Sequence, residues 1–262
     1  YMTSLKAVAD DSVTIGRSLS ELLTTPGLKQ DELETKLAGL VQQQELGLGR
    51  AAALDAPGPV FGAHERTLDS LALRVAGMEG LLATFQQTKT STDRNAAGQQ
   101  LASQAKRLTS SDVVWADLFR APAIRELERR EITGVAVPAS VFVANPDLYT
   151  TRSLTAIWQR VHGASTGGTP SGLHGNAIES VTVRPGGQVL SLDSETTIQA
   201  STDLAFDVAV TNSGDFQEVQ VEVTLTIPKQ PSPIVKKGTI DLIDPGETKS
   251  VSFANFPDPP FG

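Results

Sequence analysis

The sequence Leu204-Ala-Phe-Asp-Val-Ala-Val-Thr-Asn-Ser-Gly214 alternates apolar and polar residues and then stops at a turn-forming triplet. A second alternating run, Val219-Gln-Val-Glu-Val-Thr-Leu-Thr-Ile227, follows closely and ends at Pro228. A period of two places every other side chain on one face of a strand. Two such runs joined by a short Asn/Gly/Asp turn predict a β-hairpin with one buried face. The residues expected in its core are Phe206, Val208 and Val210.

Further short strands are predicted on both sides of this pair. Ile178–Val183 comes first and is closed by Arg184-Pro-Gly-Gly187. The runs 189–192 and 197–200 are a candidate strand pair, and the runs 234–243 and 249–253 follow the hairpin. Short strands separated by Pro/Gly turns, without helical periodicity, are typical of a sandwich. We therefore predict a β-sandwich over residues 178–262.

The N-terminal half has a different periodicity. Apolar residues recur there at alternating intervals of three and four, which predicts amphipathic helices. The first helix is expected over about 3–23, before Thr24-Thr-Pro-Gly27. Its core positions are Leu5, Val8, Ser12, Ile15, Leu19 and Leu22. The second is expected from about Asp31, whose side chain is predicted to cap it with Glu34 three residues on, and it ends at Asp55-Ala-Pro-Gly-Pro59.

The third predicted helix has the clearest pattern, and a fourth runs from about Asn95 towards Phe119. The core positions of the third are His64, Leu68, Leu71, Val75, Met78, Leu82 and Phe85. Four such segments joined by short breaks predict an antiparallel helical bundle over residues 1–162. Within it we expect a short helix from Pro122 to Ile132, a strand-like stretch in the irregular segment 134–147, and a last helix from Thr150 to His162.

Residues 163–177 are rich in Gly, Ser and Thr and have no periodicity, which predicts a flexible linker. The predicted fold class is therefore multidomain α and β: an N-terminal antiparallel helical bundle, a linker, and a C-terminal sandwich.

Composition excludes several classes of function. The net charge is −8, and no dense basic cluster is present, so we expect no nucleic-acid partner. The chain has no cysteine, which removes disulfides, thiol nucleophiles and cysteine-based metal sites. The first residue, Tyr1, has two interpretations that stay open. It is either the water side of a membrane anchor, where aromatic residues gather, or simply the point where the sequence begins.

Motifs that resemble active sites lie in unsuitable contexts. Gly163-Ala-Ser165-Thr-Gly167 matches a nucleophile elbow, but a helix precedes it where the elbow needs a strand. Ser103-Gln-Ala-Lys106 lacks the partner motifs of penicillin-binding enzymes. The run 47–52 echoes a dinucleotide loop without a preceding strand. His64, His162 and His174 are far apart, and His64 is expected inside the bundle. We therefore predict no catalytic, cofactor-binding or metal-binding residues and no cofactor.

Three sequence segments of the C-terminal half carry a resemblance to a known family. They are Phe206-x-Val-x-Val-x-Asn-Ser-Gly214, Val219-x-Val-x-Val-x-Leu225, and Asp244-Pro-Gly-Glu-Thr248 leading into Val251-x-Phe253. Residues 178–256 thereby resemble the immunoglobulin-like domains of the CARDB type. Those domains recur in extracellular and envelope-associated proteins of bacteria and archaea, often as adhesion or spacer modules. They usually carry a further strand or two, so either the natural chain continues or the sandwich has an open edge.

The resemblance implies a non-enzymatic, extracytoplasmic protein of the bacterial cell envelope. Its expected role is structural, adhesive or that of a scaffold, through contacts with a protein partner or with itself, and with a membrane anchor upstream of Tyr1. The alternative is a sensor or small-ligand-binding ectodomain, with a small molecule held between helices near Trp115 or Trp158.

Overall fold

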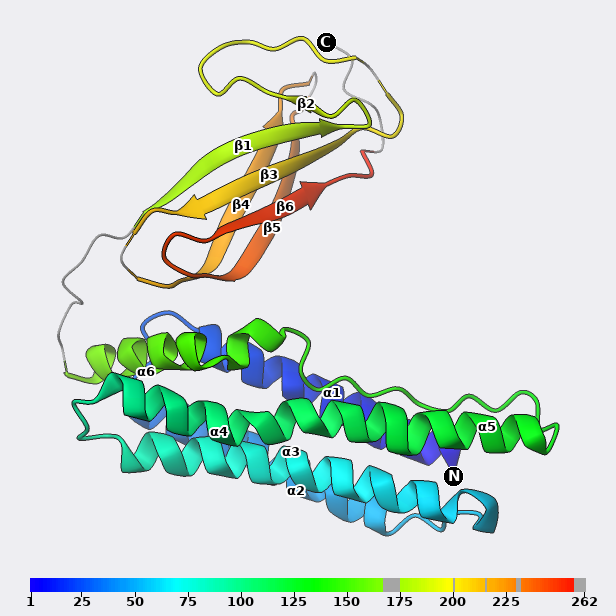
Figure 1. Ribbon diagram of the computed structural model, residues 1–262. Helices are drawn as coiled ribbons and strands as arrows, with labels where there is room; N and C mark the ends of the chain where they lie inside the picture. Colours follow the sequence, from blue (N-terminus) through cyan, green and yellow to red (C-terminus); the bar gives the residue numbers. More distant parts are fainter. Residues whose placement is uncertain (167–174, 200, 215, 230–231, 257–262) are drawn as a thin grey trace. The chain divides into compact units, whose positions relative to one another are not determined.

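The computed structural model describes residues 1–166, 175–199, 201–214, 216–229 and 232–256. The chain forms two compact units, Tyr1–Thr169 and Pro170–Gly262. Helices make up the first unit and antiparallel strands the second (Figure 1). The predicted order, a helical region followed by a β region, is confirmed.

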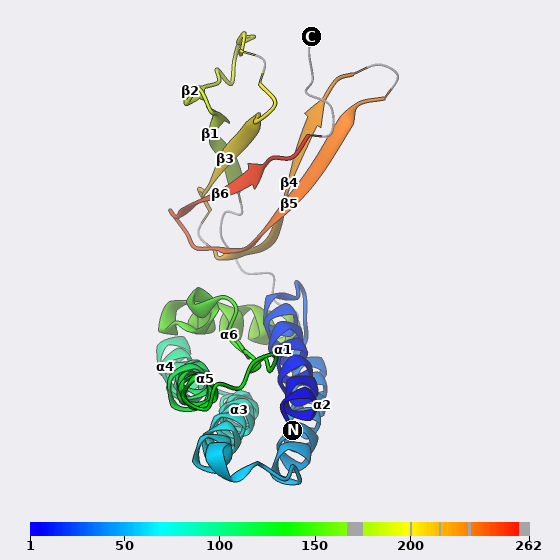
Figure 2. The same ribbon diagram turned by 90° about the vertical axis from the view of Figure 1, so that its right-hand side faces the viewer.

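The helical unit is built from long helices that lie side by side, and Figure 2 views them nearly along their axes. They are α1 (Met2–Thr24), α2 (Gln30–Ala52), α3 (Phe61–Gln87) and α4 (Arg94–Val113), with the short turn η1 (Gly58–Val60) before α3. The helix of α4 continues through a π-helical turn, η2 (Val114–Arg120), into α5 (Ala121–Arg129). After an irregular segment come η3 (Pro146–Tyr149) and α6 (Thr151–Thr166).

Helix α1 follows its predicted pattern, since all six expected core positions, Ser12 included, are buried. Helix α3 differs in register. Its buried face includes Thr67, Arg74 and Leu81, whereas the predicted positions Leu68 and Leu82 are only partly buried. Both sets of positions fit intervals of three and four from His64 to Phe85. The sequence prediction followed the more apolar set, and it thereby missed the arginine.

The N-terminus of α2 is capped differently from the prediction. Asp31 makes no capping hydrogen bond, and the N-cap residue Lys29 has no side-chain cap either. Instead, the hydroxyl of Ser165 in α6 accepts a hydrogen bond of 2.8 Å from the backbone amide of Gln30. A residue more than a hundred positions away satisfies a free helix-end amide, which local sequence cannot reveal.

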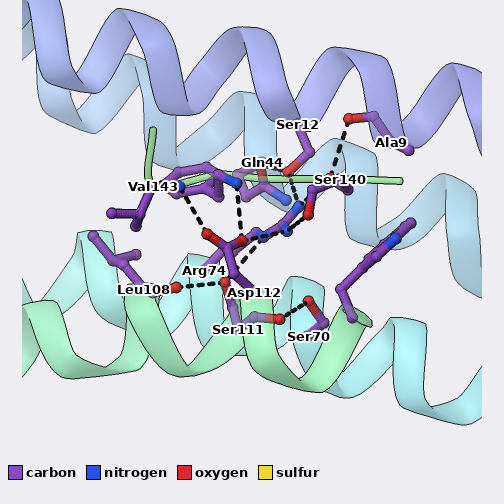
Figure 3. Close-up of polar contacts among 12 residues, drawn as sticks. Ala9, Ser12, Gln44, Ser70, Arg74, Leu108, Ser111, Asp112, Ser140 and Val143 are labelled. Carbon is purple, nitrogen blue, oxygen red and sulfur yellow. Dashed lines mark hydrogen bonds and ion pairs between the residues drawn. The ribbon is translucent and has the colours of Figure 1, made fainter. Parts of the chain in front are cut away.

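Residues 132–145, here called the inner segment, form no strand, so the strand-like prediction for this region is wrong. The inner segment runs between α1 and α4 (Figure 3). Ser140, Phe142 and Val143 are buried in it. Two of its backbone amides donate to a side chain of α4, as described below, and not to another strand. Of the four valines in this stretch, Val137 and Val143 are buried, whereas Val135 and Val141 are exposed.

The predicted linker begins too early. Helix α6 continues to Thr166, and Ser165 donates its hydroxyl hydrogen to the carbonyl of Val161 at 2.8 Å, as a helical residue does. Residues 167–174 lie outside the described residues, and the first strand begins at Asn176.

The β unit contains two antiparallel sheets (Figure 1). One has the order β2-β1-β3-β6, and the other pairs β4 with β5. The strands are β1 (Asn176–Arg184), β2 (Gln188–Val189), β3 (Ala205–Asn212), β4 (Glu218–Ile227), β5 (Ile234–Ile243) and β6 (Thr248–Phe253). The predicted core residues Phe206, Val208 and Val210 are all buried.

The predicted hairpin between the two central runs is wrong. β3 pairs with β1 and β6, and β4 pairs with β5, so the chain passes from one sheet to the other between them. Asn212, fully buried, explains the crossing. Its side-chain amide donates to the carbonyls of Phe216 at 2.7 Å and Ile243 at 3.0 Å. Its side-chain oxygen accepts from the amide of Gly214 at 2.9 Å. These bonds hold an Asx turn that leads away from β3.

The candidate strand pair 189–192 and 197–200 is also not formed. Only Gln188–Val189 makes a strand, and it pairs with β1. Residues 190–199 contain no strand, and residue 200 lies outside the described residues. The backbone amide of Ser191 donates instead to the hydroxyl of Thr196, at 3.1 Å. This run of Ser, Asp and Thr side chains bonds locally, which competes with pairing between strands.

Candidate functional site

The most unusual group in the helical unit is the guanidinium of Arg74, in the middle of α3. Its side chain is 0% exposed. A charged group leaves water only at a large cost unless hydrogen bonds and an opposite charge compensate it. A guanidinium carries five N–H donors. Each of them has an acceptor within the protein, and these acceptors come from α1, α4 and the inner segment (Figure 3).

The five hydrogen bonds of Arg74 have lengths between 2.7 and 3.1 Å. Nε donates to the hydroxyl of Ser111, one terminal nitrogen donates to the hydroxyls of Ser12 and Ser140, and the other donates to the carboxylate of Asp112 and the carbonyl of Ser140. The guanidinium therefore has no donor left for a ligand.

Asp112 balances the charge of Arg74 and also holds the inner segment. Its two carboxylate oxygens accept the backbone amides of Phe142 at 2.8 Å and Val143 at 2.9 Å. The Asp112 side chain is 20% exposed, whereas that of Arg74 is fully buried, so water reaches the ion pair only from the Asp112 side. Because backbone amides donate to a carboxylate here, the segment needs no partner strand.

Two aromatic rings lie beside the guanidinium. The Arg74 Cζ atom lies 5.4 Å from the ring centroid of Trp115 and 5.2 Å from that of Phe142, within the range of cation–π attraction. The indole N–H of Trp115 donates to the carbonyl of Pro138 at 3.0 Å. Burial lowers the pKa of Arg74 to about 10, with Asp112 opposing that shift, so the guanidinium stays charged at neutral pH.

The serine hydroxyls extend the network outwards. Ser12 accepts from Arg74 and donates to the amide oxygen of Gln44 at 2.9 Å. Ser111 donates to the carbonyl of Leu108, and Ser70 donates to the carbonyl of Ser111. The chain of hydrogen bonds ends at Gln44, whose buried Nε2 atom has no hydrogen-bond partner among the described residues. The network thus joins α1, α2, α3, α4 and the inner segment.

Gly16 lets the inner segment approach α1 closely. A Cβ atom at this position would collide with the backbone carbonyl of Phe142. Gly39 in α2 is a matched contrast, since nothing lies within 4 Å of its Cβ position. The close approach explains why a glycine occupies the middle of a long helix, where it costs up to about 1 kcal/mol against alanine.

We expect Gly16→Ala to lower the unfolding free energy of the helical unit by about 1–3 kcal/mol, because the added methyl group displaces the inner segment. Gly39→Ala should raise it by up to about 1 kcal/mol through helix propensity alone. Urea unfolding followed by tryptophan fluorescence measures both, since Trp115 and Trp158, the two tryptophans of the chain, lie in this unit. Equal effects of the two substitutions would contradict the close approach.

The histidines do not come together. His64 is buried, as predicted, and its Nδ1 atom lies 2.9 Å from the hydroxyl of Tyr1. Burial lowers the pKa of His64 and raises the pKa of Tyr1 to about 12. A neutral imidazole and a protonated phenol therefore share this hydrogen bond. His162 stacks on Trp158 with ring centroids 4.6 Å apart, and His174 lies outside the described residues.

The serines of the two motifs, Ser165 and Ser103, make hydrogen bonds that belong to the helical structure. Ser165 bridges α6 and α2, as described above. Ser103 is exposed on α4, and its hydroxyl donates to the carbonyl of Gln100 at 2.7 Å. Gly47 to Ala52 belong to the last turns of α2. Among the described residues, neither serine contacts another side chain in an arrangement that activates a nucleophile.

Both tryptophans proposed to line a ligand site are buried, Trp115 to 1% exposure and Trp158 to 5%. The indole N–H of Trp158 donates to the hydroxyl of Thr88 at 2.9 Å, so both indole donors are used within the protein. A hollow of about 370 Å³ lies elsewhere, between α1 and α2. It is lined by Ser18, Glu21, Leu22, Thr25, Lys36, Gly39, Leu40 and Gln43.

In the described ranges, His, Asp and Glu side chains nowhere gather in a group of three or more that could hold a metal ion. Over the same residues, none of the helices combines the length and the apolar composition that crossing a bilayer requires. No family model, no curated protein and no solved structure matches the chain.

Proposed function

We propose that the protein is a non-enzymatic structural, adhesive or scaffold protein of the bacterial cell envelope, which acts through contacts with other proteins or with itself. The observation that carries this proposal is the saturation of the Arg74 network. A buried arginine beside a carboxylate is the group in the helical unit best suited to bind an anionic ligand. Its five donors all have acceptors within the unit, which favours a structural role.

The surroundings of the other candidate groups support the same proposal. Catalysis by Ser165 would need a general base within hydrogen-bond distance and a sharp strand-to-helix turn that carries the serine. Its hydroxyl instead links α6 to the first amide of α2. We propose on this basis that the chain is not an enzyme.

The envelope location rests on the resemblance of residues 178–256 to CARDB-type immunoglobulin-like domains. The antiparallel sheets and the passage of the chain from β3 in one sheet to β4 in the other are compatible with an immunoglobulin-like sandwich. We extend the proposal to an extracytoplasmic location and to a membrane anchor upstream of Tyr1. The helical unit would then be the part nearer the anchor along the chain.

A sensor or ligand-binding ectodomain is the second candidate. The hollow between α1 and α2 favours it, because Glu21 and Lys36 place opposite charges beside the apolar Leu22 and Leu40. A small zwitterionic molecule would suit such a lining. This hollow, and not the surroundings of Trp115 or Trp158, is the place where a ligand would bind.

A thermal-shift screen with metabolites, followed by tryptophan fluorescence, separates the two candidates. The structural proposal expects no compound to raise the unfolding temperature of the helical unit. A compound that raises it for the natural chain but not for Gly39→Leu, which fills the hollow, would overturn the structural proposal in favour of the sensor. Light scattering of the same samples reports whether the chain self-associates.

A further inference from the structure

Strand β4 lies at an edge of its sheet in the part of the chain that the structure describes. Within the residues that the structure describes, it pairs with β5 alone. Backbone groups on the outer side of an edge strand offer a template for another strand. The inward side chains of β4 are also incompletely covered: Val223 is buried, whereas Val221, Leu225 and Ile227 are only partly buried against the core. An added strand would satisfy the backbone groups and cover these side chains.

The sequence of β4 is complementary to itself when read in the opposite direction. Two antiparallel copies centred on Val223 place Val221 opposite Leu225 and Val219 opposite Ile227. On the other face, Glu222 lies opposite Thr224, so no acid faces an acid. A register centred on Glu222 would instead put the two carboxylates opposite each other, which is destabilising.

We propose that β4 pairs antiparallel with β4 of a second copy of this chain, centred on Val223, so that the two copies share a continuous sheet of order β5-β4-β4-β5. This inference rests on the proposed function, since it names the partner as the chain itself. The contact is two-fold symmetric, and it therefore closes as a dimer.

The backbone of β4 limits the length of this pairing. Gln220 has a positive φ of 52°, a conformation that interrupts a regular ladder. The regular stretch common to both copies runs from Val221 to Leu225, symmetric about Val223. A ladder this short, with a few apolar pairs, predicts a weak and concentration-dependent dimer.

Thr224 provides a test because the same substitution has opposite effects within one chain and between two. Within a chain, Thr224 lies opposite Lys237 of β5, so Thr224→Glu is favourable and Thr224→Lys is unfavourable. Between copies it lies opposite Glu222, so Thr224→Lys is favourable and Thr224→Glu is not. Each dimer contains this pair twice. Sedimentation equilibrium of the full chain, at low salt and over a range of concentrations, gives the dissociation constant Kd of each variant.

We expect Kd to be on the order of tenfold lower for Thr224→Lys than for Thr224→Glu, given the size of cross-strand charge effects. The Thr224→Lys monomer should nevertheless have the lower thermal stability of the two variants. Ser250→Lys and Ser250→Glu, on the exposed face of β6 and opposite the neutral Ala209, make the same charge changes in the other sheet, away from the β4 edge. The Kd values of these two control variants should differ from each other by much less.

Three results would overturn the proposal. One is a chain that stays monomeric at all concentrations reached. Another is an equal effect on the Kd of the substitutions at Thr224 and at Ser250. A third is protection from hydrogen exchange in the monomer of those β4 amides that point away from β5, which would mean that another segment of the chain already covers this edge. None of these results concerns metabolite binding, so failure here is distinct from failure of the structural proposal.

Discussion

Arg74→Ala is expected to lower the free energy of unfolding of the helical unit by about 3–5 kcal/mol, the usual loss when one partner of a buried ion pair is removed. The substitution leaves the carboxylate of Asp112 without its counter-charge. It also removes a hydrogen-bond partner from Ser12, Ser111 and Ser140. The two rings that contact the guanidinium would then face a cavity.

Urea unfolding followed by tryptophan fluorescence measures this loss for the helical unit alone. Arg66→Ala is the matched control, because Arg66 lies on the same helix and pairs with Asp69 at 2.6 Å while 47% exposed. Exposed pairs of this kind contribute about 0–1 kcal/mol. A loss for Arg74→Ala as small as that for Arg66→Ala would mean that the buried network does not hold the helices together.

Phe206→Ala should have an effect of similar size in the β unit. Phe206 is 6% exposed in the core between the sheets, and its ring meets that of Phe256 edge-to-face at 5.8 Å. Truncation of a buried phenylalanine costs about 3–5 kcal/mol through lost transfer energy and the cavity that remains. The β unit should therefore unfold at much lower urea concentration.

Backbone amide signals of strands β1 to β6 in NMR spectra recorded along the urea titration follow the β unit, and tryptophan fluorescence follows the helical unit in the same samples. Val235→Ala serves as the control, since Val235 is 52% exposed on β5 and surface changes usually stay within about 0.5 kcal/mol. An unchanged β transition in Phe206→Ala would contradict the assignment of Phe206 to the core.

Periodicity alone predicts much of this fold. The spacing of apolar residues places α1 almost to the residue and locates α6 except for its last turn, because a regular helix with one buried face leaves a direct trace in the sequence. Alternation likewise locates β3, β4, β5 and β6. What these patterns report is which face of an element is buried. They do not report which element covers it.

Two of the errors concern contacts between residues that are distant in the sequence. Asn212 looked like part of a hairpin turn, but its side chain bonds to Ile243 in another strand, and this directs the chain into the second sheet. Ser165 looked like part of a linker, yet it caps a helix far away in the sequence. Side-chain hydrogen bonds of this kind have no periodicity.

Arg74 is absent from the predicted core positions of the third helix, although it has the largest role in the buried network. It shares a helical face with Leu71 and Met78, at intervals of three and four, so its position was available from the sequence. The prediction favours apolar residues, and it therefore places Val75 in the predicted helix pattern in place of the neighbouring Arg74. An arginine on an otherwise apolar helix face, together with serines on neighbouring helices, is the signal that would have found the network.

The central claim for the helical unit is that Arg74 and Asp112 hold the inner segment inside the bundle as a fixed structural part. Hydrogen exchange of the backbone amides of Phe142 and Val143, measured by NMR, tests it most directly. We expect both amides to exchange slowly, at the rate set by unfolding of the helical unit, because both donate to the carboxylate of Asp112. Exchange of either amide as fast as in an exposed loop would contradict that claim.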